Sequence, residues 1–162
     1  MKTRIFALLV ACFTCVALLI GCSSGTAAQA NDPQTQNRQY MSNVNQIMED
    51  ISTEMDSFTT AVQEGEVISL SSQLDSVNES VEKLKSLEVP EAMQDIHASY
   101  VSGAEELQTA LNDYVTLYED IKAPQSGSFD YSTYGERLAE IQEHYNAGIT
   151  ALQEADNKAS EA

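Results

Sequence analysis

The sequence predicts an all-α protein, an antiparallel four-helix bundle with up-down-up-down topology, which follows an apolar N-terminal segment and a flexible tether. Three observations support this prediction. Apolar residues recur every three or four positions in four separate segments, which is the period of a helix with one buried face. Glycine and proline residues separate these segments, and none of them shows the alternation of a β-strand. The 162 residues suffice for one domain with a buried core.

The chain begins with a segment that is typical of a secretory signal peptide. Lys2 and Arg4 supply positive charge, and the 15 residues from Ile5 to Leu19 are apolar apart from Thr14. A helix that spans a bilayer needs about 20 apolar residues, so this stretch is too short to cross comfortably. It suits the apolar core of a signal peptide, which we place at residues 1–21.

The predicted signal peptide leads into Leu19-Ile20-Gly21-Cys22, which resembles the lipobox of bacterial lipoproteins. The resemblance implies that the Cys22 thiol receives a diacylglyceryl group and that cleavage then leaves this cysteine as the first residue. The membrane is then a partner through the lipid anchor, because each buried CH₂ contributes about 0.8 kcal/mol and two acyl chains hold stably. A plain secretory signal and an uncleaved anchor are the alternatives. All three interpretations predict an extracytoplasmic protein.

Two neighbouring features refine this expectation. Ser23 follows the cysteine, and the lipoprotein resemblance then implies the outer membrane in a host with two membranes. In a host with one membrane it implies the outer face of the cell membrane. Cys12 and Cys15 form a C-x-x-C pattern, normally a redox or zinc signal, but they lie in the segment that is expected to be discarded.

Residues 22–37 are predicted to be the lipidated cysteine and a disordered tether, because positions 23–37 hold no large apolar residue. The helical domain is expected over residues 38–162. Without the signal peptide, the chain carries 6 Lys and Arg against 25 Asp and Glu, a net charge of −19. Such a field repels phosphate groups, so we expect no nucleic-acid partner.

The first two helices are predicted on either side of Gly65, and the apolar face of the second restarts out of phase with that of the first. Continuing the first face would bury Gly65, Ser69 and Ser72, so a tight turn at this glycine is the better prediction. The first face consists of Met41, Val44, Met48, Ile51, Met55, Phe58 and Val62, and the second of Val67, Leu70, Leu74, Val77, Val81 and Leu84.

The third helix is predicted to start at Pro90, because proline is tolerated at the first helical position, and to end before Pro124. Thr133 and Glu136 have the spacing of a capping box at the start of the fourth helix, which is expected to fade near Asn157. The third face consists of Met93, Ile96, Tyr100, Ala104, Leu107, Leu111, Tyr114, Tyr118 and Ile121, and the fourth of Tyr134, Leu138, Ile141, Tyr145, Ile149 and Leu152.

The sequence offers little for catalysis or metal binding. His97 and His144 are its only histidines, and no G-x-S-x-G motif is present, so we predict no enzyme. A di-iron bundle needs Glu-x-x-His, but Gln94 and Ile141 stand three residues before the histidines. Two isolated histidines also do not make a zinc site.

Haem is the alternative cofactor. In an up-down bundle His144 would lie level with Met48 and Met55, either of which would serve as the second axial ligand. The competing interpretation is that both methionines fill the core and His144 lies at its boundary. We follow the second interpretation and predict no cofactor.

Tyrosines and paired acids are the other notable side chains. The tyrosines of the third and fourth apolar faces would either line a cleft for a small molecule or glycan, or pack as core rings with their hydroxyls at the rim. The second interpretation is favoured. The acidic doublets lack the spacing of a calcium loop and fit solvated helix faces. They are Glu49-Asp50, Glu105-Glu106 and Glu119-Asp120.

A second, looser resemblance concerns the start of the third helix. The stretch Leu87-Glu88-Val89-Pro90, followed by His97, Tyr100, Ala104, Glu106-Leu107 and Tyr114, resembles a pattern in small helical lipoproteins of bacteria, and it implies no activity. We therefore expect a lipid-anchored, non-enzymatic interaction module with an envelope protein as partner. A small-ligand or haem carrier and a helix-pairing homo-oligomer are the alternatives.

Overall fold

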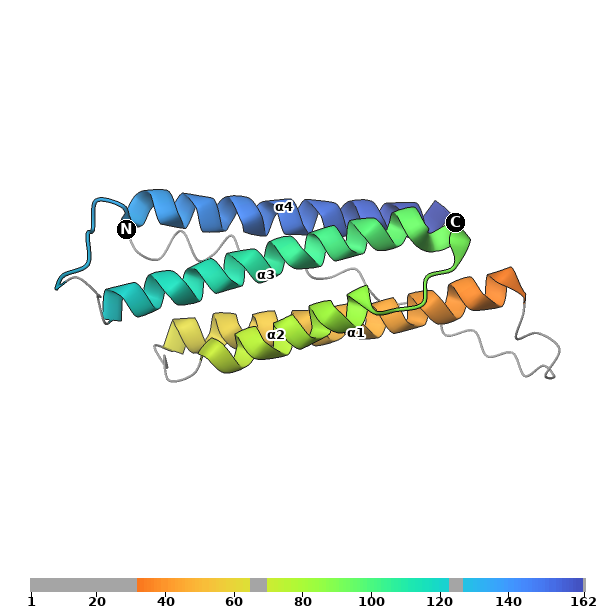
Figure 1. The fold of residues 1–162 in the computed structure, drawn as a ribbon, viewed down its shortest axis with the longest axis horizontal. Coiled ribbons are helices and arrows are strands. Elements are labelled where there is room, and N and C mark those ends of the chain that lie inside the picture. Colours follow the sequence, from red (N-terminus) through yellow and green to blue (C-terminus); the bar gives the residue numbers. More distant parts are fainter. Residues whose placement is uncertain (1–31, 65–69, 123–126, 162) are drawn as a thin grey trace.

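The computed structural model describes residues 32–64, 70–122 and 127–161, without the side chains of residues 62–64. These ranges form α1 (Pro33–Glu64), α2 (Leu70–Lys85), the 3₁₀ turn η2 (Glu91–Met93), α3 (Gln94–Lys122) and α4 (Tyr134–Glu161). Successive α-helices run in opposite directions (Figure 1). The predicted all-α antiparallel bundle is therefore confirmed. The Cys22 lipobox, the turn at Gly65 and Pro124 lie outside the described residues.

The first helix begins earlier than the sequence predicts. α1 starts at Pro33, so residues 33–37 are helical and the prediction of a tether up to residue 37 is wrong for them. The Asp32 carbonyl oxygen accepts the N–H groups of Thr35 and Gln36 at 2.9 and 3.1 Å. Proline fits the first helical position because its missing N–H has no partner there. A lack of apolar residues excludes a segment from the core, but it does not stop a helix from extending into solvent.

The start of α3 also differs from the prediction. Pro90 precedes the helix instead of occupying its first turn, and the Met93 N–H donates to the Pro90 carbonyl oxygen at 2.8 Å. This bond closes the 3₁₀ turn η2, a tighter turn that often begins an α-helix.

The predicted capping box before α4 is wrong. The Thr133 hydroxyl donates to the Asp130 carbonyl oxygen at 3.0 Å, and within the described ranges no hydrogen bond joins it to Glu136. The Asp130 carboxylate instead accepts the Ser132 N–H at 2.9 Å, which forms an Asx turn before the helix. α4 then continues to Glu161, past the predicted fading point.

The core lies mainly between α1, α2 and α3. The largest side chains with almost no exposure are Ile51, Leu84, Leu107, Leu111, Val44, Val77 and Val81. From α4, the buried apolar side chains are Leu152 and Ala155. α2 is also tied to α3 by Lys85, whose Nζ lies 2.8 Å from a Glu105 oxygen.

The buried face of α1 is rotated from the predicted one. Tyr40 and Ile47 are buried, whereas the predicted core residues Met41, Met48 and Met55 are half-buried. α1 packs along α2 and also meets α3 through the rings of Tyr40 and Phe58. The face that it buries is therefore wider than the single row of residues that the sequence predicts.

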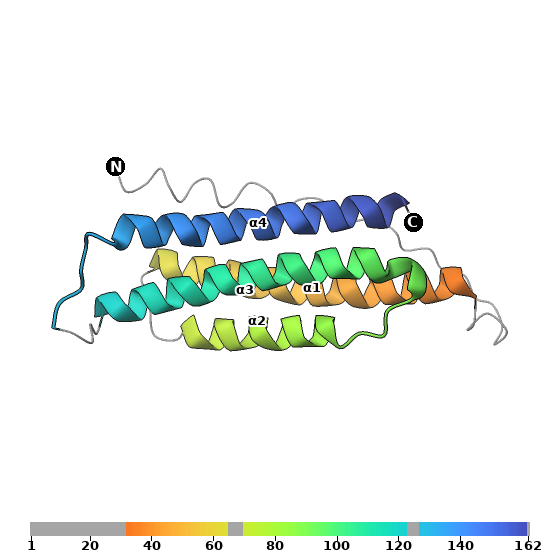
Figure 2. The ribbon, with the colours of Figure 1, turned by 45° about the horizontal axis from the view of Figure 1, so that its top comes forward.

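At the loop end of the bundle, the α3–α4 hairpin projects beyond α1 and α2 (Figures 1 and 2). Tyr134, predicted to be in the core, lies on this projection and is 40% exposed. That prediction is wrong because Tyr134 is the first residue of α4 and lies at the projecting end of the hairpin.

Among the described helices, α3 and α4 form the pair with the most extensive contact, and two glycines allow their backbones to approach. A Cβ atom placed on Gly148 would lie 2.9 Å from the Gly103 carbonyl oxygen, and one placed on Gly103 would lie 2.8 Å from Leu152. The two backbones therefore approach more closely than any larger residue allows. Within the described ranges, α1 and α4 are not among the helix pairs in extensive contact.

Candidate functional site

The clearest group of polar contacts lies at the end of the bundle where α1 begins. The Tyr40 hydroxyl of α1 forms a hydrogen bond of 2.9 Å with Nδ1 of His97 on α3. The two rings meet nearly edge to face, with centres 6.0 Å apart and planes at 65°. Tyr40 is buried and His97 half-buried, so this bond lies at the core boundary.

Burial keeps both members of this pair neutral. Desolvation raises the pKa of Tyr40 to about 12 and lowers the pKa of His97, because an apolar environment disfavours the charged form of each group. Near pH 7 one hydrogen bond therefore joins a phenol and a neutral imidazole, and the histidine tautomer decides which of them donates.

A second tyrosine links α3 to α4 at the same end. The hydroxyl of Tyr100 donates to the Asp156 carboxylate at 2.6 Å, the length of a charge-assisted bond. Burial, followed by this bond and the negative charge of Asp156, raises the pKa of Tyr100 well above its ordinary value. Tyr40 adds to this rise, which indicates that the two phenols are near each other.

We name Tyr40, His97, Tyr100 and Asp156 the polar clamp. Next to it, Lys158 donates to the Ser99 hydroxyl at 2.9 Å, and these contacts hold α1 and α4 to α3. The clamp joins three helices through two side-chain hydrogen bonds, Tyr40 to His97 and Tyr100 to Asp156. Its geometry therefore favours a structural role at this end of the bundle.

The haem candidates are placed differently from the arrangement that the alternative requires. Nδ1 of His144 lies 2.7 Å from Oε2 of Glu106 on α3, with the two side chains 40% and 37% exposed. This bond, together with the charges of Glu106, Asp113 and Glu143, raises the pKa of His144. Met48 and Met55 pack against the core on α1, which has no extensive contact with α4 in the described ranges.

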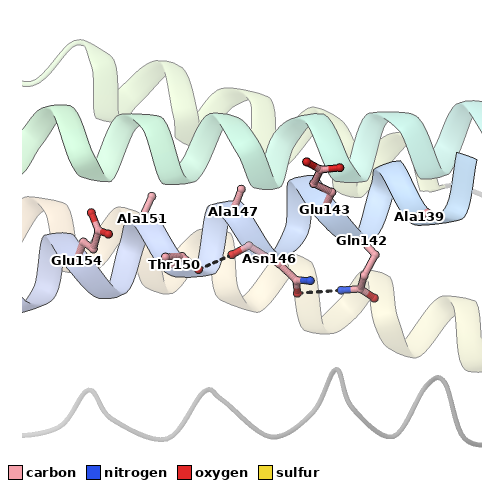
Figure 3. Close-up of a pocket in the computed structure, with 8 residues that line it drawn as sticks. All are labelled: Ala139, Gln142, Glu143, Asn146, Ala147, Thr150, Ala151 and Glu154. Atoms are coloured by element: carbon pink, nitrogen blue, oxygen red, sulfur yellow. Dashed lines mark hydrogen bonds between the residues drawn. The ribbon is translucent and has the colours of Figure 1, made fainter. Parts of the chain in front are cut away.

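The tyrosines of α3 and α4 do not share one site, although Tyr134 and Tyr118 lie near enough to Tyr114 to add to the rise in its pKa that burial causes. Tyr114 packs edge to face against Phe58 of α1, with ring centres 5.2 Å apart, whereas Tyr100 belongs to the polar clamp at the other end. An open hollow lies instead along the outer face of α4 (Figure 3), where Gln142 and Thr150 each form a hydrogen bond with Asn146. Its lining comes from α4 alone within the described ranges.

The described residues show neither a membrane span nor a metal cluster. They contain no helix that is long and apolar enough to span a bilayer. No group of three or more His, Cys, Asp or Glu side chains in this part of the chain is arranged to hold a metal ion. Cys22, the predicted lipidation site, lies outside the described residues.

A family model matches residues 34–152, from the first turn of α1 to the last third of α4. The chain belongs to DUF6376, a family of unknown function. No curated protein and no solved structure matches it. The DUF6376 region contains the Tyr40–His97 pair and the His144–Glu106 pair, whereas Asp156 of the polar clamp lies beyond the match.

Sequence reasoning missed two members of the polar clamp. Tyr40 lies one residue before the first predicted apolar face, but its spacing of four and seven residues from Val44 and Ile47 was a usable signal. Asp156 gave no such signal, because a single acid near the end of a helix resembles any solvated residue. Only the packing of α4 on α3 brings its carboxylate to Tyr100.

Proposed function

We propose that this chain is a lipoprotein, anchored through Cys22 on the extracytoplasmic side of a bacterial membrane, whose helical domain acts by binding and not by catalysis. The observation that carries the proposal is the order of features in the first 22 residues. Lys2 and Arg4 precede a 15-residue apolar stretch, and the lipobox-like Leu19-Ile20-Gly21-Cys22 follows directly. Each feature alone is common, whereas this order is the one that lipid attachment requires.

The character of the domain supports an interaction role. A continuous apolar core joins α1, α2 and α3, with Leu152 and Ala155 of α4 packed against it. Such a core can stabilise the bundle without a cofactor. Burial of each aliphatic side chain contributes roughly 1.5–3 kcal/mol to the free energy of folding before the loss of chain entropy is subtracted. A tethered domain of this kind meets partners in the envelope, and its strong negative charge favours basic ones.

Acyl labelling tests the anchor. Cells that express the chain are grown with an alkyne-bearing fatty acid, and the wild type is compared with Cys22→Ala and with the matched control Cys15→Ala. We expect label, cleavage and membrane fractionation in the wild type and in the Cys15 variant. The Cys22 variant should remain an unlabelled, uncleaved precursor by mass spectrometry.

Either of two results would remove the anchor from the proposal. One is equal labelling of the Cys22 variant. The other is a wild-type protein without acyl groups and with an N-terminus at another residue, which would assign the segment to an ordinary secretory signal. Crosslinking in intact cells then tests the interaction role, which predicts a specific envelope protein attached to the domain.

A further inference from the structure

An exposed aromatic surface lies where α3 connects to α4. Among the described residues, the exposed large hydrophobic side chains are Tyr131, at 71% exposure, and Tyr134, at 40%. Phe129 contacts Tyr131 edge to face, with ring centres 5.0 Å apart and planes at 83°. We name Phe129, Tyr131 and Tyr134 the aromatic tip. Tyr131 and Tyr134 belong to one turn, in which the Tyr134 N–H donates to the Tyr131 carbonyl oxygen at 3.4 Å. Exposed apolar side chains that lie this close in the chain are typical of a binding surface.

The aromatic tip lies at the far end of the molecule from the start of α1 (Figures 1 and 2). It belongs to the part of the α3–α4 hairpin that projects beyond α1 and α2. The 29 residues of α3 separate the two ends by about 44 Å, at 1.5 Å per residue. An anchor at Cys22 would attach to the α1 end, so the tip would face away from the membrane. This orientation rests on the proposed function.

The backbone between the rings is held in one conformation. The Asp130 carboxylate accepts the Ser132 N–H at 2.9 Å, and the Asp130 carbonyl oxygen accepts the Thr133 hydroxyl at 3.0 Å. Hydrogen bonds from the side chain and backbone of Ser132 lower the pKa of Asp130, so this exposed carboxylate is anionic near pH 7. A loop that is ordered in advance loses less entropy when a partner binds.

The charge around the aromatic tip favours a basic partner. Asp130 directly precedes Tyr131 and Glu136 follows Tyr134 by two residues, and both carboxylates are exposed. The nearby cation Arg137 is already paired with Asp120 at 2.8 Å. Lys122, at the end of α3, is then one basic side chain against the two carboxylates of Asp130 and Glu136. The net charge of −19 beyond the signal peptide adds long-range attraction for cations and repulsion for anionic polymers.

We propose that the aromatic tip is a docking surface for a basic segment of a partner protein. Arginine or lysine side chains of that segment stack on the faces of Tyr131 and Tyr134, and they pair with the carboxylates of Asp130 and Glu136. Cation–π contacts and ion pairs reinforce each other here, because the rings are exposed next to the carboxylates and no basic side chain of this loop competes for them.

Nuclear magnetic resonance tests where a basic probe binds. The full chain in detergent micelles is titrated with the peptide Arg-Gly-Arg-Gly-Arg at low and high salt. We expect the largest shifts at Tyr131, Tyr134 and Asp130, with affinity that falls as salt rises. The double variant Tyr131→Ala/Tyr134→Ala should bind about tenfold more weakly, since two exposed cation–π contacts are lost.

Two matched comparisons separate the aromatic tip from general charge attraction. The double variant Tyr131→Phe/Tyr134→Phe keeps both rings and should bind like the wild type. Asp130→Asn retains an oxygen for the Ser132 N–H but loses the charge, so its affinity should fall. Asp50→Asn makes the same charge change on an exposed position of α1 and should leave binding unchanged. Circular dichroism checks that each variant is folded.

Three results would overturn this inference. The first is a set of shifts spread along the helix faces, and the second is unchanged affinity in the double alanine variant. The third is binding of a soluble N-acetylglucosamine oligomer at the tip in place of the peptide, which would assign the rings to a glycan. The titration needs no bilayer, so its failure is distinguishable from a failure of acylation at Cys22.

Discussion

Replacing Gly148 with alanine tests how closely α3 and α4 must approach each other. The added Cβ would lie 2.9 Å from the Gly103 carbonyl oxygen and 2.9 Å from two side-chain atoms of Leu107. All three distances are shorter than an ordinary van der Waals contact. Leu107 can adjust by rotating its side chain, but the carbonyl oxygen is part of the α3 backbone. The variant must therefore push the two helices apart locally.

The expected change in the free energy of unfolding is the difference of two effects. Overpacking a tight contact costs about 1–3 kcal/mol, and the upper end applies because backbone is involved. Alanine in a helix interior recovers about 1 kcal/mol relative to glycine. We therefore expect Gly148→Ala to destabilise the domain by about 2 kcal/mol, measured by urea denaturation followed by circular dichroism.

Gly135→Ala is the matched control on the same helix. No atom lies within 4 Å of a Cβ at Gly135, so only the gain in helix propensity remains. We expect a stabilisation below about 1 kcal/mol, because the position is in the first turn of α4. Gly103→Ala should resemble Gly148→Ala. The double variant of the two should cost less than the sum, since the first alanine already separates the helices.

The opposite outcome is easy to recognise. If Gly148→Ala were as stable as the wild type, or more stable in the manner of Gly135→Ala, the two helices would not be in backbone contact at this crossing. The close approach of α3 and α4 at Gly103 and Gly148 would then be disproved.

Three other predictions concern the titratable groups and the core. In ring-proton titrations, His144 should have a pKa above 6.5 and His97 one below it. The stability that His144 contributes is full below pH 6.5 and is lost as pH rises through its raised pKa, whereas the contribution of His97 is present above 6.5 and is lost as pH falls. Tyr100→Phe should destabilise the domain by about 1.5 kcal/mol, the lower end for a bond to a charged group whose partner regains water. A double-mutant cycle with Asp156→Ala should show coupling, and additivity would disprove the clamp. Leu84→Ala, at a side chain with 0% exposure, should cost about 2–5 kcal/mol in the same denaturation assay, and a cost below 1 kcal/mol would contradict the described core.

Much of the fold followed from local patterns. Val44, Ile51 and Phe58 were predicted on one buried face of the first helix, and the structure buries all three. Pro90 lies at the boundary before α3, as expected, although the turn η2 separates it from the helix. These predictions succeed because helical period and proline chemistry act over a few residues of the same chain.

Other features depended on residues that are distant in the sequence. Tyr40 is covered because His97, which lies 57 positions later, packs on it, and Met48 is only half-buried because α1 is rotated toward α2 and α3. Tyr134 has the right spacing for the core but begins α4 at the projecting end of the hairpin, where it is 40% exposed.

The sequence by itself determined the helical class and the order of the helices, and it predicts an anchor at Cys22. These depend on the period of apolar residues, on breaks in the chain and on a short linear motif. Only the tertiary structure decided that Gly103 and Gly148 meet, that Asp156 reaches Tyr100 and that the aromatic tip is exposed. Each of these features depends on how far one helix extends along another and on how each helix is rotated about its axis. Contacts between segments that are distant in the sequence supply the free energy that fixes the extent and the rotation.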